Sequence, residues 1–312
     1  MKTRHAFLAA VLSACVVAAY AEPATIHEEK VFQAKPGGTF KVDASFHDVT
    51  VTLAQGTQVK VVVDVKADTW PSDAKEAIKE YAPVFKEEGD LILVRCRPAH
   101  GSLRFGYSRM NGSVDVTMPP GMKLVLDTGS GDIRVEGDTG PSDVTCESGS
   151  GDVSVSGTVR DLTIETGSGD VVVKASGEVG KTSIETGSGG VRFEGATAKI
   201  RVETGSGDVE LSGLTGDARF DTGSGDVEAE WARVPRGGVI KADTGSGEVV
   251  LRLAADAVLG GILDTSSGSV RCDWPGTSDE RGRRMALAGG AGAVTLDVDT
   301  GSGDITVVKK AG

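Results

Sequence analysis

Apolar and polar residues alternate one by one through most of the chain after residue 120. In the segment 162–173, Leu162, Ile164, Val171 and Val173 are apolar, and mainly polar residues fall between them. Alternation with a period of two predicts β-strands that bury one face and expose the other. A Gly-Ser-Gly tripeptide separates the two apolar pairs, so the pattern predicts two short strands joined by a tight turn.

The strand pair and its turn recur nine times. Each copy begins with an acidic residue followed by Thr-Gly-Ser-Gly or a close variant, and successive copies start 20, 18, 20, 18, 18, 22, 21 and 35 residues apart. A period near twenty is typical of solenoids, whose stacked rungs bury a core that no single rung could bury. We therefore expect an all-β fold, a parallel β-solenoid (β-helix) of about nine two-strand rungs over residues 121–312. The first acids of the copies are Asp127, Glu147, Glu165, Glu185, Glu203, Asp221, Asp243, Asp264 and Asp299.

The residues of the repeated turn have expected structural roles. Glycine is expected because a chain that reverses within a few residues uses positive φ angles, which other residues avoid. The threonine before the turn, replaced once by Ser148, is expected to form a ladder along one edge of the stack. The acid after the turn is expected to accept hydrogen bonds from turn amides. Arg201, Arg219 and Lys241 each lie two residues before an acid and are expected to offset repulsion between stacked carboxylates.

The region 22–120 differs from the repeats, and we interpret it as an irregular β cap on the solenoid. Strand-like runs lie on both sides of residues 72–82, and residues 48–51 resemble a decayed rung. Residues 72–82 themselves predict one short helix, with Ser72 as its N-cap and Pro83 directly after its end.

Residues 1–21 predict a signal peptide. Lys2 and Arg4 precede an apolar stretch of about 14 residues, and cleavage is expected after Ala21 at an Ala-x-Ala site. A stretch this short falls below the ~20 residues needed to span a bilayer, and no other stretch is longer. We expect a protein exported to the periplasm or the cell exterior, without a membrane span. In the alternative, residues 12–15 form a lipobox and the protein is a lipoprotein anchored at Cys15.

Charge and rare residue types argue against several function classes. The 312 residues include 33 basic and 45 acidic ones, for a net charge of −12, so nucleic acid is not an expected partner. The four cysteines show no Cys-x-x-Cys spacing, which argues against a zinc site or a disulfide scaffold. The histidines after the leader, His27, His47 and His100, all precede the repeats, and no turn reads Gly-x-Ser-x-Gly. Serine catalysis is therefore not expected.

No cofactor is expected either. Columns of stacked acids are one arrangement that could hold Ca²⁺, because hard cations bind clustered oxygens. The calcium β-roll has a nine-residue repeat, however, whereas here the period is about twice as long and the acid follows glycine directly. Cys146 and Cys272 fall on inward-facing positions about six rungs apart, so we expect two core residues too distant for a disulfide.

The repeated motif resembles that of a known family. Its copies, the lead-in Val116–Gly121 and the segment Gly289–Gly292 before the last copy are similar to the putative-adhesin family of bacterial β-strand-repeat proteins of unknown function. The turn chemistry is also similar to that of the head domains of autotransporter adhesins. The resemblance covers about residues 30–310. It implies a Gly-turned β-solenoid, and it implies no catalytic residues.

The residues that break the periodicity are the candidate ligand-binding residues. They form two groups, which are Trp231, Arg233 and Arg236, and then Trp274, Arg281, Arg283 and Arg284 in the last insertion. Tryptophan and arginine together can stack on acidic sugars and pair with their charges. The structural alternative is that these residues form looser turns and an end cap, which solenoids require.

The sequence favours an exported, non-catalytic β-solenoid that serves as an adhesin or as a structural or interaction module of the cell envelope. Its expected partner is a cell-envelope or surface glycan, or a protein. An enzyme is not expected, because an enzyme keeps one site whereas this chain repeats one turn nine times. Two alternatives stay open, a glycan-processing β-helix enzyme and an envelope-stress accessory protein with a protein partner.

Overall fold

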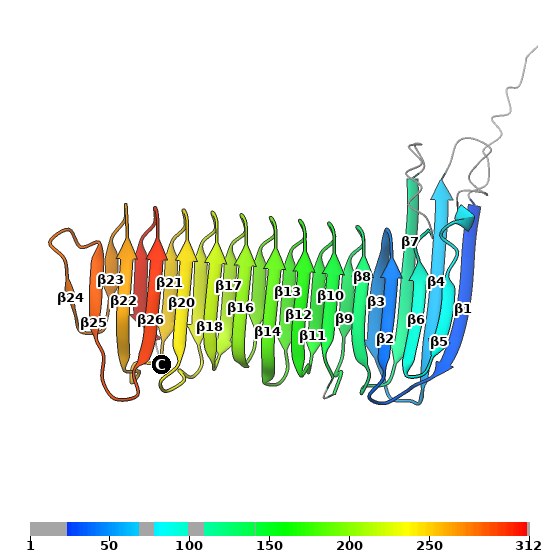
Figure 1. The fold of residues 1–312 in the computed structure, drawn as a ribbon, viewed down its shortest axis with the longest axis horizontal. Coiled ribbons are helices and arrows are strands. Elements are labelled where there is room, and N and C mark those ends of the chain that lie inside the picture. Colours follow the sequence, from blue (N-terminus) through cyan, green and yellow to red (C-terminus); the bar gives the residue numbers. More distant parts are fainter. Residues whose placement is uncertain (1–23, 69–77, 99–108, 141, 311–312) are drawn as a thin grey trace, which may run out of the picture.

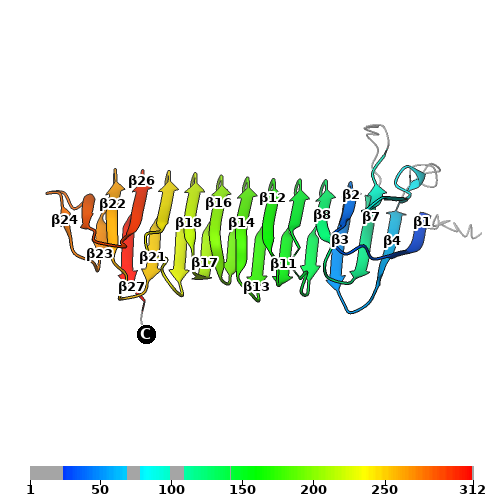
Figure 2. The ribbon, with the colours of Figure 1, turned by 60° about the horizontal axis from the view of Figure 1, so that its bottom comes forward.

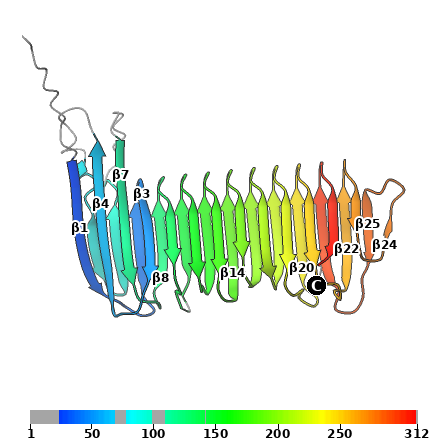
Figure 3. The ribbon, with the colours of Figure 1, turned by 180° about the vertical axis from the view of Figure 1, so that it is seen from behind.

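The computed structural model describes residues 24–68, 78–98, 109–140 and 142–310, which form two long β-sheets (Figure 1). Sheet A has 13 strands and sheet B has 14, and most neighbouring strands are parallel. Figures 2 and 3 show that the rungs follow one another along a single long axis. The expected all-β architecture with two long, mainly parallel sheets is confirmed.

Each rung contributes one strand to each sheet. In spatial order, sheet A contains β1 (Ala24–Gln33), β4 (Gln58–Asp68), β7 (Arg109–Met118), β3 (His47–Leu53), β9 (Ile133–Glu136), β11 (Val153–Gly157), β13 (Val171–Ala175), β15 (Val191–Glu194), β17 (Val209–Leu214), β19 (Val227–Trp231), β21 (Val249–Leu253), β27 (Ile305–Lys309) and β23 (Val270–Cys272). Sheet B contains β24 (Gly276–Ser278), β25 (Arg284–Ala288), β22 (Leu259–Thr265), β26 (Val294–Thr300), β20 (Val239–Thr244), β18 (Asp217–Thr222), β16 (Thr197–Thr204), β14 (Val179–Thr186), β12 (Asp161–Thr166), β10 (Val144–Ser148), β8 (Lys123–Thr128), β2 (Thr39–Ala44), β6 (Leu91–Cys96) and β5 (Val84–Glu88).

Neighbouring rungs pair with equivalent residues side by side. In sheet B, Glu147 pairs with Glu165, and Glu165 pairs with Glu185. Because the register repeats, each inward position stacks on the same position of the next rung, and Ile164 and Val173 are at most 1% exposed. Alternation along the sequence therefore becomes one continuous core along the stack.

Glycine is required in the Gly-Ser-Gly turn because successive turns touch. The expectation of positive φ there is wrong, since the positive φ angles in the described residues belong to other glycines, such as Gly137 and Gly157 in the second turn. A Cβ atom on Gly151 would come within 3.0 Å of the Gly131 carbonyl oxygen, and one on Gly169 equally close to the Gly151 oxygen. A side chain at these positions would push neighbouring rungs apart.

The expected threonine ladder is confirmed, and the acids after the turn also connect rungs. The Thr166 hydroxyl donates to the Gly151 carbonyl oxygen of the preceding rung (3.0 Å) and accepts from the Gly169 amide of its own turn (3.2 Å). The Asp152 carboxylate accepts from the Asp170 amide of the following rung (2.8 Å). These acids do accept from turn amides, but each serves its neighbour's turn instead of its own.

The last rung in the sequence is not the last rung in the stack. Strand β26 lies between β20 and β22, and β27 lies between β21 and β23. Strand β25 runs antiparallel beside β22, and β24 pairs antiparallel with β25 at the end of sheet B. After β25 the chain returns to form the inner rung. Val298 and Ile305 of this inner rung are consequently at most 1% exposed, because rungs cover it on both sides.

The amino-terminal region extends both sheets. Strands β2 and β3 pair in parallel with β8 and β9, so the predicted decayed rung at 48–51 is a true rung. Beyond it, β4 pairs antiparallel with β1 and β7 in sheet A, and β5 pairs antiparallel with β6 in sheet B. Phe32 packs against Phe85 with ring centroids 6.2 Å apart. The helix expected over 72–82 lies mostly outside the described residues. No described helix has the length and apolar character needed to cross a membrane.

Replacing Gly169 by alanine tests the stacking constraint. We expect Gly169→Ala to lower the free energy of unfolding by roughly 3 kcal/mol, because its Cβ atom would collide with backbone. Ser168→Ala in the same turn is the control; its side chain is exposed, so a change within about 0.5 kcal/mol is expected. Urea unfolding followed by circular dichroism measures both. Equal midpoints for the two variants would contradict the role given to this glycine.

Candidate functional site

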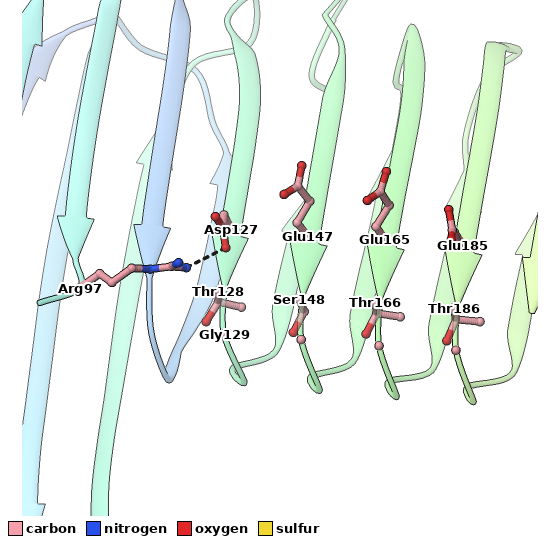
Figure 4. A pocket seen from close by; sticks show the side chains of 13 residues that line it. Arg97, Asp127, Thr128, Gly129, Glu147, Ser148, Glu165, Thr166, Glu185 and Thr186 are labelled. Atoms are coloured by element: carbon pink, nitrogen blue, oxygen red, sulfur yellow. Dashed lines mark hydrogen bonds and ion pairs between the residues drawn. The ribbon is translucent and has the colours of Figure 1, made fainter. Parts of the chain in front are cut away.

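The Gly-Ser-Gly edge of the stack carries a column of acids in register. Along sheet B the column consists of Asp43, Asp127, Glu147, Glu165, Glu185, Glu203, Asp221, Asp243, Asp299 and Asp264. Part of it lines an open groove of about 580 Å³, in which Glu147, Glu165 and Glu185 lie side by side (Figure 4). We name this feature the acidic groove.

Basic side chains neutralise the ends of this column. Arg97 pairs with Asp43 (2.7 Å) and Asp127 (2.9 Å) at one end, and Arg284 pairs with Asp264 at the other. Partial burial raises the pKa of Asp299, and the neighbouring Asp243 and Asp264 carboxylates raise it further.

Two of the three expected neighbours also neutralise the column from the side. Arg201 pairs with Glu203 and Arg219 with Asp221 (3.8 Å), as predicted, whereas Lys241 pairs with Asp297 of the adjoining rung. Among the described residues no group of three or more His, Cys, Asp or Glu side chains has a metal-binding arrangement. The acidic groove therefore gives no positive support for a metal site.

A second hollow lies on the opposite edge, where the loops are irregular. It has a volume of about 940 Å³ and lies between the loops 232–238, 254–258 and 289–293. Arg233 and Arg236 line it, and both are exposed. Figure 1 shows these loops along the lower edge of the stack, beside the marked C-terminus. We name this hollow the arginine cleft.

The two tryptophans predicted to stack on ligands are buried, so this prediction is corrected. Trp231 is 0% exposed, and its indole N–H donates to the Gly216 carbonyl oxygen (3.0 Å). Trp274 is 7% exposed, donates to the Ala257 carbonyl oxygen (2.7 Å) and lies under the Lys309 ammonium group. Neither ring has a free face for a sugar. Instead, Trp231 anchors the start of one cleft loop, and Trp274 anchors another through Ala257.

The remaining candidate arginines lie away from the cleft. The Arg283 guanidinium donates to the Ser266 carbonyl oxygen (2.8 Å), Arg284 pairs with Asp264, and Arg281 is exposed. These contacts join the end segment to the terminal rung, which is the end-cap role that the sequence left open. The structure thus separates the seven candidates into two cleft-lining arginines, two buried anchors and an end cap.

The cysteines are structural. Cys146 pairs in register with Ile164 and is fully buried, as predicted, and burial raises the pKa of its thiol to about 12. Cys272 is only half-buried, because its strand β23 forms the end of sheet A. Cys96, Cys146 and Cys272 are all free thiols. Cys15 and Ala21 lie outside the described residues.

Comparison with known proteins identifies the family of this chain. The sequence matches the family described as Toastrack DUF4097 over residues 40–308. The chain belongs to this family. The family resemblance expected from the repeats is thereby confirmed. No curated protein matches this toastrack chain.

Several solved structures are similar to this toastrack chain. One is described as a putative adhesin from Parabacteroides distasonis, with 13% identity, coverage of 91% of this chain and 97% of that one, and a TM-score of 0.47. Another from the same organism is described as a putative lipid binding protein, with 13% identity, 90% and 96% coverage and a TM-score of 0.49. A putative cell adhesion protein from Clostridium sporogenes has 10% identity, 92% and 100% coverage and a TM-score of 0.27. Similarity at this level identifies no ligand.

His47 is a buried group that the toastrack repeat does not explain. It is 0% exposed, stacks on Phe46 with ring centroids 4.5 Å apart, and neither ring nitrogen has a hydrogen-bond partner. Burial lowers its pKa from the ordinary 6.5 to about 4. His27, by contrast, is exposed and contacts Asp64 (2.7 Å), and His100 lies outside the described residues. No described histidine contacts a turn serine.

His47 should make the toastrack fold less stable in acid. A group whose folded pKa is depressed favours folding above its unfolded pKa, so the contribution is lost as pH falls from 6.5 towards 4. The shift corresponds to about 3 kcal/mol of unfolding free energy. We expect His47→Phe to remove that part of the pH dependence in urea unfolding at pH 7 and pH 4, and His27→Gln to leave it in place. Parallel pH profiles for wild type and His47→Phe would disprove this.

Proposed function

We propose that this chain is a non-catalytic binding module of the cell envelope, adhesive or structural in role, whose partner is a surface glycan or a protein. The observation that carries the proposal is that repeated and non-repeated polar side chains have different contacts. Those that recur on each rung, such as Thr166 and Asp152, are used in hydrogen bonds between rungs. Arg233 and Arg236, which break the repeat, line a cleft instead.

The glycan-processing alternative has less support. That alternative needs exposed tryptophans beside arginines to hold the sugar, and both Trp231 and Trp274 are buried. The arginine cleft has one acid in its described lining, Asp256, whereas glycoside hydrolysis ordinarily uses a pair of carboxylates. In the acidic groove Asp127 is held by Arg97, and the other carboxylates of the lining repeat in equivalent positions from rung to rung.

The proposal includes export of the chain. We expect the mature protein to begin at Glu22, because the Ala-x-Ala site ends at Ala21. Intact-mass measurement of protein purified from its native cells decides this directly. A mass that corresponds to an acylated Cys15 would instead show a lipoprotein.

A binding screen tests the proposed function. The mature protein is incubated with cell-wall glycans, host glycans and envelope extracts, and bound and released material is followed over time. We expect binding without shortened products, and a loss of binding of about tenfold or more in Arg233→Ala/Arg236→Ala. Arg281→Ala is the matched control, because Arg281 is exposed at the other edge. Shortened glycan products, or no binding to any fraction, would overturn the proposal.

A further inference from the structure

We propose that the arginine cleft binds an anionic group, a carboxylate or a phosphate, that carries an aliphatic part. Arg233 and Arg236 would hold the anion, and aliphatic side chains of the lining such as Val234 and Val258 would hold the aliphatic part. The inference rests on the proposed function as a binding module, since it names the chemistry of the ligand for the same cleft.

The first observation in support of an anionic ligand is that the charges of Arg233 and Arg236 are unpaired among the described residues. Most arginines on this acidic protein are held by carboxylates, as Arg160 is by Asp143 (2.7 Å) and Arg192 by Glu210. In the described part of the chain, neither the Arg233 nor the Arg236 side chain has an acidic partner within ion-pair distance. A guanidinium presents a planar fork of N–H donors that fits carboxylate and phosphate oxygens. Two unpaired guanidiniums in one hollow therefore form a local cationic site on a protein of net charge −12.

The second observation concerns the side chains that form the walls of the cleft. Its described lining holds aliphatic and small side chains and no aromatic ring. Val258 is 47% exposed there, whereas most large apolar residues in the described part of the chain are buried. Sugar rings commonly stack on aromatic faces, and those are absent from this lining, whereas an aliphatic chain packs on valine, proline and alanine. The aliphatic side chains of the lining thus offer contacts to a hydrocarbon part next to the anion.

The cleft is also held in shape before any ligand arrives. The Gly237 amide donates to the Gly292 carbonyl oxygen (3.1 Å), and the Val294 amide donates to the Val258 oxygen (2.9 Å), so each outer loop is tied to its neighbour. Trp274 fixes the loop 254–258 through Ala257. Loops that are already ordered cost less entropy on binding. The volume of about 940 Å³ is in the range of sites for small ligands.

Asp256 is the acid in the lining, and it allows a sharper test of the ligand's charge. If the ligand is an anion, the Asp256 carboxylate repels it, and Asp256→Asn should strengthen binding.

Calorimetric titration of the mature protein with octyl phosphate, below its micelle concentration, tests the proposal. We expect saturable binding that weakens about tenfold or more in Arg233→Ala/Arg236→Ala, stays unchanged in Arg281→Ala and strengthens in Asp256→Asn. Inorganic phosphate lacks the aliphatic part and octyl glucoside lacks the charge, so both should bind more weakly. Circular dichroism spectra and melting temperatures of the variants confirm that they are folded.

A second experiment distinguishes a membrane lipid from a free ligand as the molecule that carries the anion. Vesicles of phosphatidylglycerol in phosphatidylcholine are compared with pure phosphatidylcholine vesicles in a flotation assay. Flotation that depends on both arginines identifies a membrane lipid, whereas binding of octyl phosphate without flotation identifies a free ligand. No binding of octyl phosphate, equal binding of octyl glucoside, unchanged binding in the double variant or weaker binding in Asp256→Asn would each overturn the proposal. Retained binding of envelope fractions would then leave the proposed function intact.

Discussion

Each Gly-Ser-Gly turn lies directly on the backbone of the turn before it, and the rest of the stack depends on this contact. Because a Cβ atom on Gly151 or Gly169 would collide with a carbonyl oxygen of the preceding rung, the turns stack at one fixed distance and in one register. That register places Thr166 where its hydroxyl reaches the Gly151 oxygen, and Asp152 where its carboxylate reaches the Asp170 amide. Polar side chains that would otherwise be free to bind ligands thus become part of the scaffold.

The same register brings like charges together. Acids in one column lie a strand spacing of ~4.8 Å apart, where two unit charges in water repel by about 1 kcal/mol. The column is tolerated because its carboxylates face solvent and because Arg97 and Arg284 close its ends. Arg97 shows that this compensation crosses strands, since it pairs with Asp43 and with Asp127 of the neighbouring strand. Lys241 instead pairs with Asp297, which lies outside the column. Neutralisation is therefore a property of the stacked sheet and not of a single repeat.

Properties that depend on neighbouring residues could be predicted from the sequence, and properties that depend on three-dimensional contacts could not. Alternation and period predicted the strands, the core position of Cys146 and the threonine ladder, because each repeats locally. The need for glycine was predicted, but from the wrong cause. The contact between a turn and the backbone of the preceding rung cannot be derived from the sequence of a single repeat. The break at Trp231 was recognised, but a buried anchor and an exposed ligand platform give the same signal in a sequence. Only the structure separates Trp231 from Arg233.

The position of the final rung has a mechanical consequence. A solenoid stacked in sequence order can fray from its end one rung at a time, because each rung contacts only its neighbours. Here the strands nearest the C-terminus, β26 and β27, are held on both sides, and the outermost rung is β22 with β23. A force that pulls on the chain just after β27 must therefore extract an inner rung against two interfaces at once. By the same logic, β22 and β23 can complete their pairing only after β26 and β27, which follow them in the sequence, have inserted between them and the rest of the stack.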